Sequence, residues 1–549
     1  MTIYIKYFLS YLLLLSILAI EGCGTSPQAD QVTDKPNIII IYADDVGYGD
    51  ISAYGSELIQ TPHIDQLAEE GIKFTDAYAT SAMCTPSRYS LLTGIYAFRL
   101  PGAGILSAEE PMLIESESVT LPGVLRKAGY RTSIVGKWHL GLGDRYGELD
   151  WNAEIKPGPL EVGFDESFLM PVTNDRVPTV YVSGHHVYGL NPDDDPILVR
   201  YPEEGHHEYQ EEQFGKEGAN PSTIYEPLVG NLPTGLSHPE LLRYPADVQH
   251  SGTIVNGVSR IGHMAGGQSA LWDDEEMAFE FTERSQRFIR ENQKNPFFLF
   301  LSMHQNHVAR QPHPQFLNTS GVGLRGDTVH ELDWVVGQIV KTLDELNIRE
   351  ETLIIFTSDN GPVIYDGYED GALEDHNGHD PNGVNIRGGK YIAYEGGTRM
   401  PTIAAWPNQI EAGQVSEAII SQVDFLATMA SLAGADVPDN ADLDSQDLSS
   451  ALLGKSDKGR DNVIQQSSDG LAIRQGPWKY IEPGERSEWG YNRHNLGNTP
   501  LNIEPLTSQA YLFNLEEDSQ ETVNLAEKHP EIVREMDELL NQLREHPDN

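Results

Sequence analysis

Short apolar runs recur along the chain, and amphipathic or polar segments separate them. The clearest runs lie at residues 37–42, 296–301 and 352–357, where Ile, Leu and Phe fill most positions. A strand that is buried on both faces has this pattern, because neither of its sides meets water. A further strand is expected at residues 132–135. We therefore expect these runs to form the centre of a parallel β-sheet.

The segments between the runs carry helix signals. Thr61 and Pro62 begin one helix, since Thr is a good cap and Pro is favoured in the first turn, and Gly71 ends it. Residues 121–129 repeat this arrangement, and residues 327–346 place apolar side chains at helical spacing. Strands that alternate with helices predict an α/β fold, in which a large, mostly parallel, mixed sheet is sandwiched by helices.

The N-terminal segment differs from the rest. Residues 1–22 predict a signal peptide, because an apolar run follows Lys6 and is shorter than the ~20 residues of a membrane-spanning helix. Cys23 then stands in a context that resembles a bacterial lipobox, whose cysteine is lipidated, and residues 23–35 predict a polar tether. This interpretation predicts an exported lipoprotein of a Gram-negative bacterium, periplasmic or at the cell surface, that touches the membrane only through its lipid anchor. The alternative is an ordinary secretory signal with an incidental cysteine.

Two further parts follow the tether. Residues 36–455 are predicted to form the α/β domain, with insertions at 140–260 that are rich in Pro, Gly, Asp and His and are expected to face the substrate. Residues 456–549 are predicted to form a small C-terminal α+β subdomain, since short strand-like pieces precede an amphipathic helix at 530–540.

Composition narrows the classes of partner. The 549 residues include 83 acidic and 37 basic side chains, which gives a formal net charge of −46. So acidic a chain repels phosphate groups, which argues against nucleic acid and against an anionic membrane surface as bulk partners. Cys23 and Cys84 are the only cysteines, so the sequence excludes both a disulfide framework and a thiolate zinc site.

Polar side chains follow the predicted strands at the points where the strands end. In chain order these side chains are Asp44, Asp45, Lys137, His139, His304, His307, Asp359 and Asn360. Ligands of open α/β sheets bind beyond the carboxyl ends of the strands, so we expect these groups to converge. Three carboxylates and an amide oxygen suit a hard cation, which predicts Ca²⁺, with Mg²⁺ as the alternative.

The most specific stretch is Cys84-Thr85-Pro86-Ser87-Arg88, with Leu-Leu-Thr-Gly at residues 91–94. Taken alone, it predicts the start of a helix. Together with the residues behind it, it resembles the signature of the formylglycine-dependent sulfatase family, which belongs to the alkaline phosphatase superfamily. In that family the cysteine becomes formylglycine (3-oxoalanine), an aldehyde that hydrates to a geminal diol. A helix N-terminus at this point would also favour an anionic substrate.

The resemblance extends along nearly the whole chain after residue 35 and implies an alkaline-phosphatase-like fold. Further blocks that resemble the family are residues 36–50, 136–141, 358–361, 387–390, 394–401, 476–480 and 512–515. It implies a metal site formed by Asp44, Asp45, residue 84, Asp359 and Asn360.

The resemblance also implies catalytic roles. Arg88 and Lys137 would hold the diol and the metal shell, and Lys390 would contact the sulfate. His307 would protonate the leaving oxygen, and His139 would remove the second diol proton. His304 lies three positions from His307, so either histidine could be the donor, and His304 could instead bind substrate.

The family resemblance predicts a hydrolase of sulfate esters, acting on saccharides from sulfated algal polysaccharides or glycosaminoglycans. Arg310 and Arg474, in segments expected to vary, are candidates for substrate contacts. The expected partner is a formylglycine-generating or anaerobic sulfatase-maturing enzyme. One alternative is a phosphomonoester, phosphodiester or phosphonate hydrolase of the same superfamily, and another is a non-catalytic lipoprotein that binds sulfated glycans through calcium.

Overall fold

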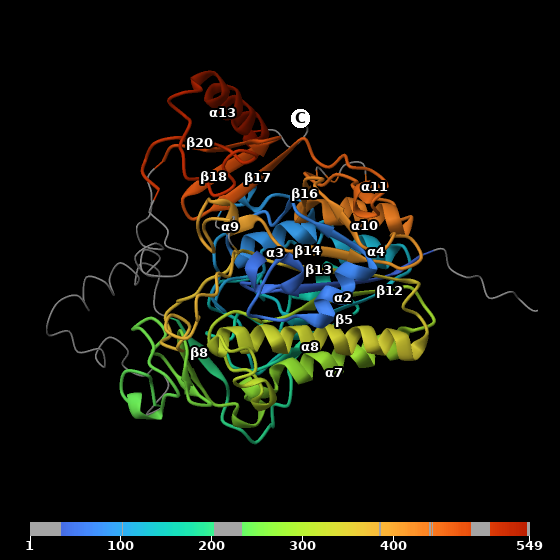
Figure 1. Cartoon of the computed structure of the whole chain (residues 1–549). Helices are drawn as coiled ribbons and strands as arrows, with labels where there is room; N and C mark the ends of the chain where they lie inside the picture. Colours follow the sequence, from blue (N-terminus) through green and yellow to red (C-terminus); the bar gives the residue numbers. More distant parts are fainter. Residues whose placement is uncertain are drawn as a thin grey trace, which may run out of the picture. The chain divides into compact units, whose positions relative to one another are not determined.

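Figure 1 shows a computed structural model of the chain. The structure describes residues 35–101, 103–201, 233–383, 386–438, 441, 443–484 and 506–545. The predicted signal peptide, Cys23 and all of the predicted tether except Lys35 lie outside these residues. The described part of Pro36–Asn549 belongs to one compact unit. No helix within the described ranges is long and apolar enough to cross a membrane.

A ten-stranded sheet forms the centre of this unit. Its strand order is β15 (Gln414–Ser416), β2 (Ile72–Phe74), β14 (Thr402–Ala405), β13 (Thr352–Ser358), β1 (Asn37–Ala43), β12 (Phe297–Ser302), β4 (Arg131–Lys137), β5 (Glu166–Met170), β6 (Val182–Ser183) and β7 (His186–Val187). The strands from β13 to β5 run parallel, whereas β14 and β6 pair antiparallel with their neighbours. The predicted mixed, mostly parallel sheet is confirmed.

Helices cover both faces of the sheet (Figure 1). In β1, Ile38, Ile40 and Tyr42 face one apolar layer, and the alternate residues Ile39 and Ile41 face the other. The first layer is covered by α3 (Cys84–Thr93), α4 (Leu121–Lys127) and α10 (Phe425–Ala433), and the second by α2 (Pro62–Glu70), α7 (Met277–Asn292) and α8 (Gly323–Leu346). The all-apolar runs therefore reflect burial on both sides.

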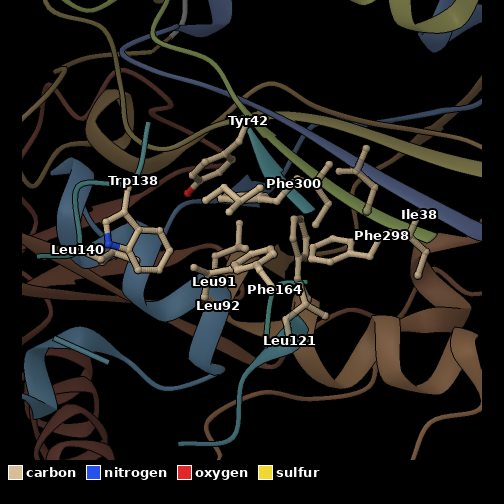
Figure 2. Packing of buried hydrophobic residues seen from close by; sticks show 14 of the residues in the cluster. Ile38, Tyr42, Leu91, Leu92, Leu121, Trp138, Leu140, Phe164, Phe298 and Phe300 are labelled. Carbon is tan, nitrogen blue, oxygen red and sulfur yellow. The ribbon is translucent and has the colours of Figure 1, made fainter. Parts of the chain in front are cut away.

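Aromatic packing anchors the helix that begins at Cys84. Leu91 and Leu92 of α3 lie in the same cluster as Tyr42, Phe298 and Phe300 of the sheet (Figure 2). The rings of Tyr42 and Phe300 are 5.4 Å apart. Because buried residues of this kind are closely packed, α3 has little freedom to shift against the strand ends.

A smaller antiparallel sheet lies at the C-terminal end of the chain. It consists of β17 (Asn462–Ser467), β18 (Gly470–Gln475), β19 (Trp478–Ile481) and β20 (Tyr511–Asn514), and α13 (Pro530–Glu545) packs against it. The predicted α+β subdomain is confirmed, while its boundary at residue 455 stays a prediction.

Besides short 3-10 helices, the described chain contains further short strands and helices. They are β3 (Ala77–Tyr78) paired with β16 (Ile420–Ser421), β8 (Leu198–Arg200) paired with β11 (His263–Ala265), β9 (Ile254–Val255) paired with β10 (Val258–Ser259), α9 (Glu395–Thr398) and α11 (Ser449–Leu452). The paired strands β8 to β11 lie in or beside the insertions at 140–260.

A buried carboxyl group joins two helices and predicts a pH effect on stability. Asp333 of α8 accepts hydrogen bonds from the backbone N–H groups of His63 and Ile64 in α2, both at 2.9 Å. Burial raises the pKa of Asp333 to about 7. The folded chain therefore binds this proton more tightly than the unfolded chain does, so the carboxyl group lowers stability as pH rises from about 4 to about 7.

We expect Asp333→Asn to flatten this part of the pH dependence by up to about 1.4 kcal/mol per pH unit. Urea unfolding of both proteins at pH 5 and pH 7 measures the difference. Asp344→Asn, at an exposed position on the same helix, is the control. An Asp333→Asn slope equal to that of the unchanged protein would contradict the assignment.

Candidate active site

The predicted polar groups meet at the carboxyl edge of the central strands. Asp44 and Asp45 follow β1, Asp359 follows its parallel neighbour β13, and Lys137 ends β4. Their side chains are fully buried. The backbone at Asp45 has a φ of 58°, in the left-handed region that side-chain-bearing residues rarely adopt. Strain of this kind persists where the surroundings fix it, as they do at functional sites.

The acidic side chains form one tight group. Potential ligand atoms of Asp44, Asp45, Cys84 and Asp359 all lie within 4.8 Å of one another. Burial and the charge of Asp359 raise the pKa of Asp44 to about 7. Asn360 donates its Nδ2–H to Asp45 Oδ1 at 2.7 Å, while its own Oδ1 is buried without a hydrogen-bond partner. An unpartnered amide oxygen beside crowded carboxylates fits a hard divalent cation.

Each carboxylate also has a buried cationic partner. Lys137 Nζ lies 2.5 Å from Asp44 Oδ2, and Lys390 Nζ lies 2.8 Å from Asp45 Oδ2. Arg88 donates to Asp359 Oδ2 from both Nε, at 3.0 Å, and a terminal nitrogen, at 2.8 Å. These side chains balance the carboxylates, so a bound divalent cation would leave the site positive. Such a site attracts anions.

Cys84 occupies the first residue of α3 and is almost fully buried. Its Sγ lies 3.8 Å from Asp44 Oδ1. Burial raises the pKa of the thiol, because the thiolate would be desolvated. A thiol that holds its proton is a weak nucleophile. The unmodified cysteine is therefore poorly suited to attack a substrate.

A small cavity of about 110 Å³ opens at Cys84. Its lining residues are Cys84, Ile105, His139, Asp175, Arg176, Gln249, His250, Ile261, His307, Asp366, Lys390 and Tyr391. Four of these residues were predicted as site residues, and the structure brings them to one cavity: Cys84, His139, His307 and Lys390. Arg88 and Lys137 lie behind it, in contact with the carboxylates.

The ring nitrogens of His139 and His307 are held differently. His139 Nε2 lies 3.0 Å from the carbonyl oxygen of Leu106, so Nε2 carries the hydrogen and the buried Nδ1, which has no partner, keeps its lone pair. His307 Nδ1 contacts the carbonyl of Val308, which leaves Nε2 for a ligand. Burial lowers the pKa of both rings. His139 can accept a proton at Nδ1, and His307 can exchange one at Nε2.

His304 points elsewhere. It is absent from the cavity lining, and its ring packs edge-on against Phe281 with 5.9 Å between ring centroids. Burial lowers the pKa of His304 to about 3. Of the two histidines left open by the sequence, the structure places His307 in the cavity.

Arg310 and Arg474 are not among the residues that line this cavity, so their contact with substrate stays a prediction. Arg310 is buried, pairs with Asp370 at 2.7 Å and donates to the carbonyl of Val363 at 2.9 Å. Arg474 lies on β18 and pairs with Asp76. Both guanidinium groups serve ion pairs within the protein.

Several residues that line the cavity were not predicted from the sequence. Arg176 pairs with Asp175 at 2.9 Å, and His250 Nε2 lies 3.4 Å from the other Asp175 oxygen. Tyr391 donates to Asp366 Oδ2 at 3.1 Å. Asp175, Arg176 and His250 come from the insertions at 140–260, whose His- and Asp-rich composition was the only signal for them.

Comparisons with known proteins agree with this geometry. The family model described as Sulfatase matches residues 36–435. The N-acetylgalactosamine-6-O-sulfatase of Bacteroides thetaiotaomicron is 44% identical over 536 residues, covering 97% of this chain and 98% of the relative. A solved structure from the metabolism of multiple glycosaminoglycans by the same species has a TM-score of 0.85 at 44% identity, covering 93% of this chain and 100% of that one. A phosphonate monoester hydrolase of Agrobacterium radiobacter, at 16% identity and a TM-score of 0.54 over 93% of this chain and 95% of the other, shares the fold.

Proposed function

This chain belongs to the sulfatase family, and from this premise we propose that it removes the 6-sulfate of N-acetylgalactosamine in saccharides derived from glycosaminoglycans. The substrate rests on the 44% identity, over nearly both full lengths, to a sulfatase named for that sugar and position. The observation that carries the reaction class is the placement of Cys84 at a helix start, beside buried carboxylates and a cavity.

One cationic centre is proposed. Within the described ranges, each candidate ligand group includes Asp44 or Asp45, so the groups overlap at a single place. A phosphatase-type pair of metal ions needs ligands around two positions about 3.5–4 Å apart. Here the ammonium group of Lys390 already pairs with the oxygens of Asp45 and Asp366 that a second ion would use. The arrangement therefore favours a single Ca²⁺, with Mg²⁺ as the alternative, held by Asp44, Asp45, Asp359 and Asn360. Such an ion would polarise a sulfate oxygen.

We propose that a maturing enzyme converts Cys84 to formylglycine. The hydrated aldehyde would supply an oxygen nucleophile whose second hydroxyl allows the ester to break down without an attacking water. Arg88 and Lys137 hold the surrounding carboxylates, and Lys390 faces the cavity where the anion binds. His307 Nε2 delivers a proton to the leaving oxygen, and His139 Nδ1 accepts one.

The roles of the two neighbouring histidines predict unequal losses. We expect His307→Gln to lower kcat by about 10² to 10⁴-fold, the range for a lost general acid. His304→Gln should cost less than about tenfold, because His304 packs on Phe281 outside the cavity lining. Steady-state rates of both variants on one sulfated saccharide measure this. A larger loss from His304→Gln would reverse the assignment.

A substrate panel tests the proposed function. The protein is produced with a maturing enzyme and supplied with Ca²⁺, and sulfate release is followed by anion chromatography. We expect release from N-acetylgalactosamine-6-sulfate, and none from the 4-sulfate or from 6-phosphates. Release from the 4-sulfate alone would overturn the position, and release of phosphate alone would overturn the reaction.

Export and anchoring also belong to the proposal. The apolar run before Cys23 and the lipobox-like context support a periplasmic or surface lipoprotein. An enzyme placed there would meet saccharides outside the cytoplasm.

A further inference from the structure

The segment that carries Lys390 depends on the C-terminal subdomain. Lys390 is buried, and its Nζ lies between Asp45 Oδ2 at 2.8 Å and Asp366 Oδ2 at 3.3 Å. The next residue, Tyr391, has a φ of 75°. A large side chain is strained in this left-handed region, and such a conformation persists only where its surroundings impose it.

Hydrogen bonds from two directions impose it. The backbone N–H of Tyr391 donates to the carbonyl of Ala82 at 2.7 Å. The carbonyl of Tyr391 accepts two hydrogen bonds from Ser468, one from the backbone N–H at 2.9 Å and one from Oγ at 2.7 Å. Ser468 lies in the turn between β17 and β18. One serine of the C-terminal sheet therefore satisfies both lone pairs of the strained residue's carbonyl.

The same hairpin also holds the segment that leads to Cys84. The N–H of Ala82 donates to the carbonyl of Gln466 at 2.7 Å, and the N–H of Gln466 donates to the carbonyl of Thr80 at 2.9 Å. Residues 466–468 thus bind the approach to Cys84 on one side and Tyr391 on the other.

Residues on both sides of Lys390 are also held by the C-terminal part of the chain. Glu521 Oε2 accepts from the backbone N–H of Glu395 at 2.6 Å, and the carbonyl of Glu521 accepts from Arg387 at 3.0 Å. Lys479 of β19 lies 3.0 Å from Glu395 Oε1 and 2.9 Å from Glu521 Oε1. Both flanks of Lys390 are therefore tied to residues after 460.

We infer that the β17–β18 hairpin is part of the sulfate-binding apparatus and that Ser468 is a positioning residue, which sets Lys390 over the anion through the Tyr391 carbonyl. This inference rests on the proposed function, in which Lys390 contacts the sulfate. Ser468 touches neither the cavity nor the carboxylate group, so its effect must pass through Tyr391 and Lys390.

Ser468→Ala tests the inference, because it removes one of the two hydrogen bonds and keeps the backbone. We expect KM, and the dissociation constant of inorganic sulfate, to rise about threefold to tenfold, with kcat changed by less than about twofold. Calorimetric titration of the calcium-loaded protein with sulfate measures the binding. Ser456→Ala is the control, since Ser456 Oγ accepts from the backbone N–H of Lys458 at 3.0 Å, outside the β17–β18 hairpin. It should leave both constants unchanged.

A double-mutant cycle separates positioning from general stability. In a Lys390→Ala background, Ser468→Ala should weaken sulfate binding no further, because its route of action is gone. Two results would overturn the inference while the proposed function stands. One is an equal, additive loss of sulfate affinity in both backgrounds, and the other is a Ser468→Ala protein that binds sulfate as well as Ser456→Ala does. An unchanged protein that binds sulfate but hydrolyses no sulfate ester would instead overturn the proposed function, and the binding cycle would still test Ser468.

Discussion

Replacement of Cys84 by alanine is expected to abolish sulfate release, with a loss of at least about 10⁴-fold, and to leave the fold intact. The loss follows from chemistry, since removal of a covalent nucleophile costs rates of this order. The intact fold follows from packing, because α3 is anchored by Leu91 and Leu92 and Cys84 contributes only a small side chain. Sulfate release and thermal unfolding, measured on the same preparation, check both parts.

Two further variants sharpen this result. Cys84→Ser, produced with a maturing enzyme that accepts only cysteine, should be as inactive as Cys84→Ala, because an unconverted hydroxyl lacks the second oxygen of the diol. Cys23→Ala removes the chain's other cysteine and should retain activity. Full activity of Cys84→Ser under these conditions would refute the formylglycine mechanism.

Removal of the metal ion is expected to lower kcat/KM by at least about 10³-fold, with recovery when Ca²⁺ is restored. An electrostatic contribution of several kcal/mol to the transition state has this consequence. Removal should also lower the unfolding temperature, because Asp44, Asp45 and Asp359 then face one another without the ion. At a hundredfold excess over Kd, binding adds about 2.7 kcal/mol of stability.

A pair of aspartate variants tests where the calcium ion binds. Asp359→Asn should weaken calcium binding, measured by calorimetry, at least tenfold. Asp424→Asn is the matched control, since Asp424 is also buried and paired with an arginine, Arg460, yet lies outside the ligand group. It should lower stability while calcium affinity stays constant. Equal calcium affinity in all the proteins would place the ion elsewhere.

The periodicity of the sequence was sufficient to predict the central strands and the edge of the sheet at which the predicted metal ligands lie. The apolar run at 37–42 requires burial on both faces, and a parallel neighbour then brings Asp359 beside Asp44 and Asp45. Helix α7 was not predicted, although Phe281, Phe288 and Ile289 carry a helical spacing, because irregular residues precede it. Loops have no such period, so the sequence could not show that Asp175 and His250 meet.

The ion-pair partners of Arg310, in a loop, and of Arg474, on β18, could not be predicted from the sequence either. A guanidinium group is equally suited to a carboxylate of the protein and to a sulfate, and the sequence does not distinguish the two. Arg310 finds Asp370 60 positions away, and Arg474 finds Asp76 398 positions away. Contacts between residues so far apart in the sequence are seen only in the folded chain.

The burial of the segment that begins α3 limits the time during which another enzyme can reach Cys84. Cys84, Thr85 and Arg88 are at most 1% exposed, and Arg88 is held by Asp359, which follows β13 and is synthesised 271 residues later. A second enzyme cannot reach the thiol once these contacts exist. The proposed conversion of Cys84 would therefore have to precede folding, and a chain that folds with an unconverted cysteine is expected to be stable but inactive.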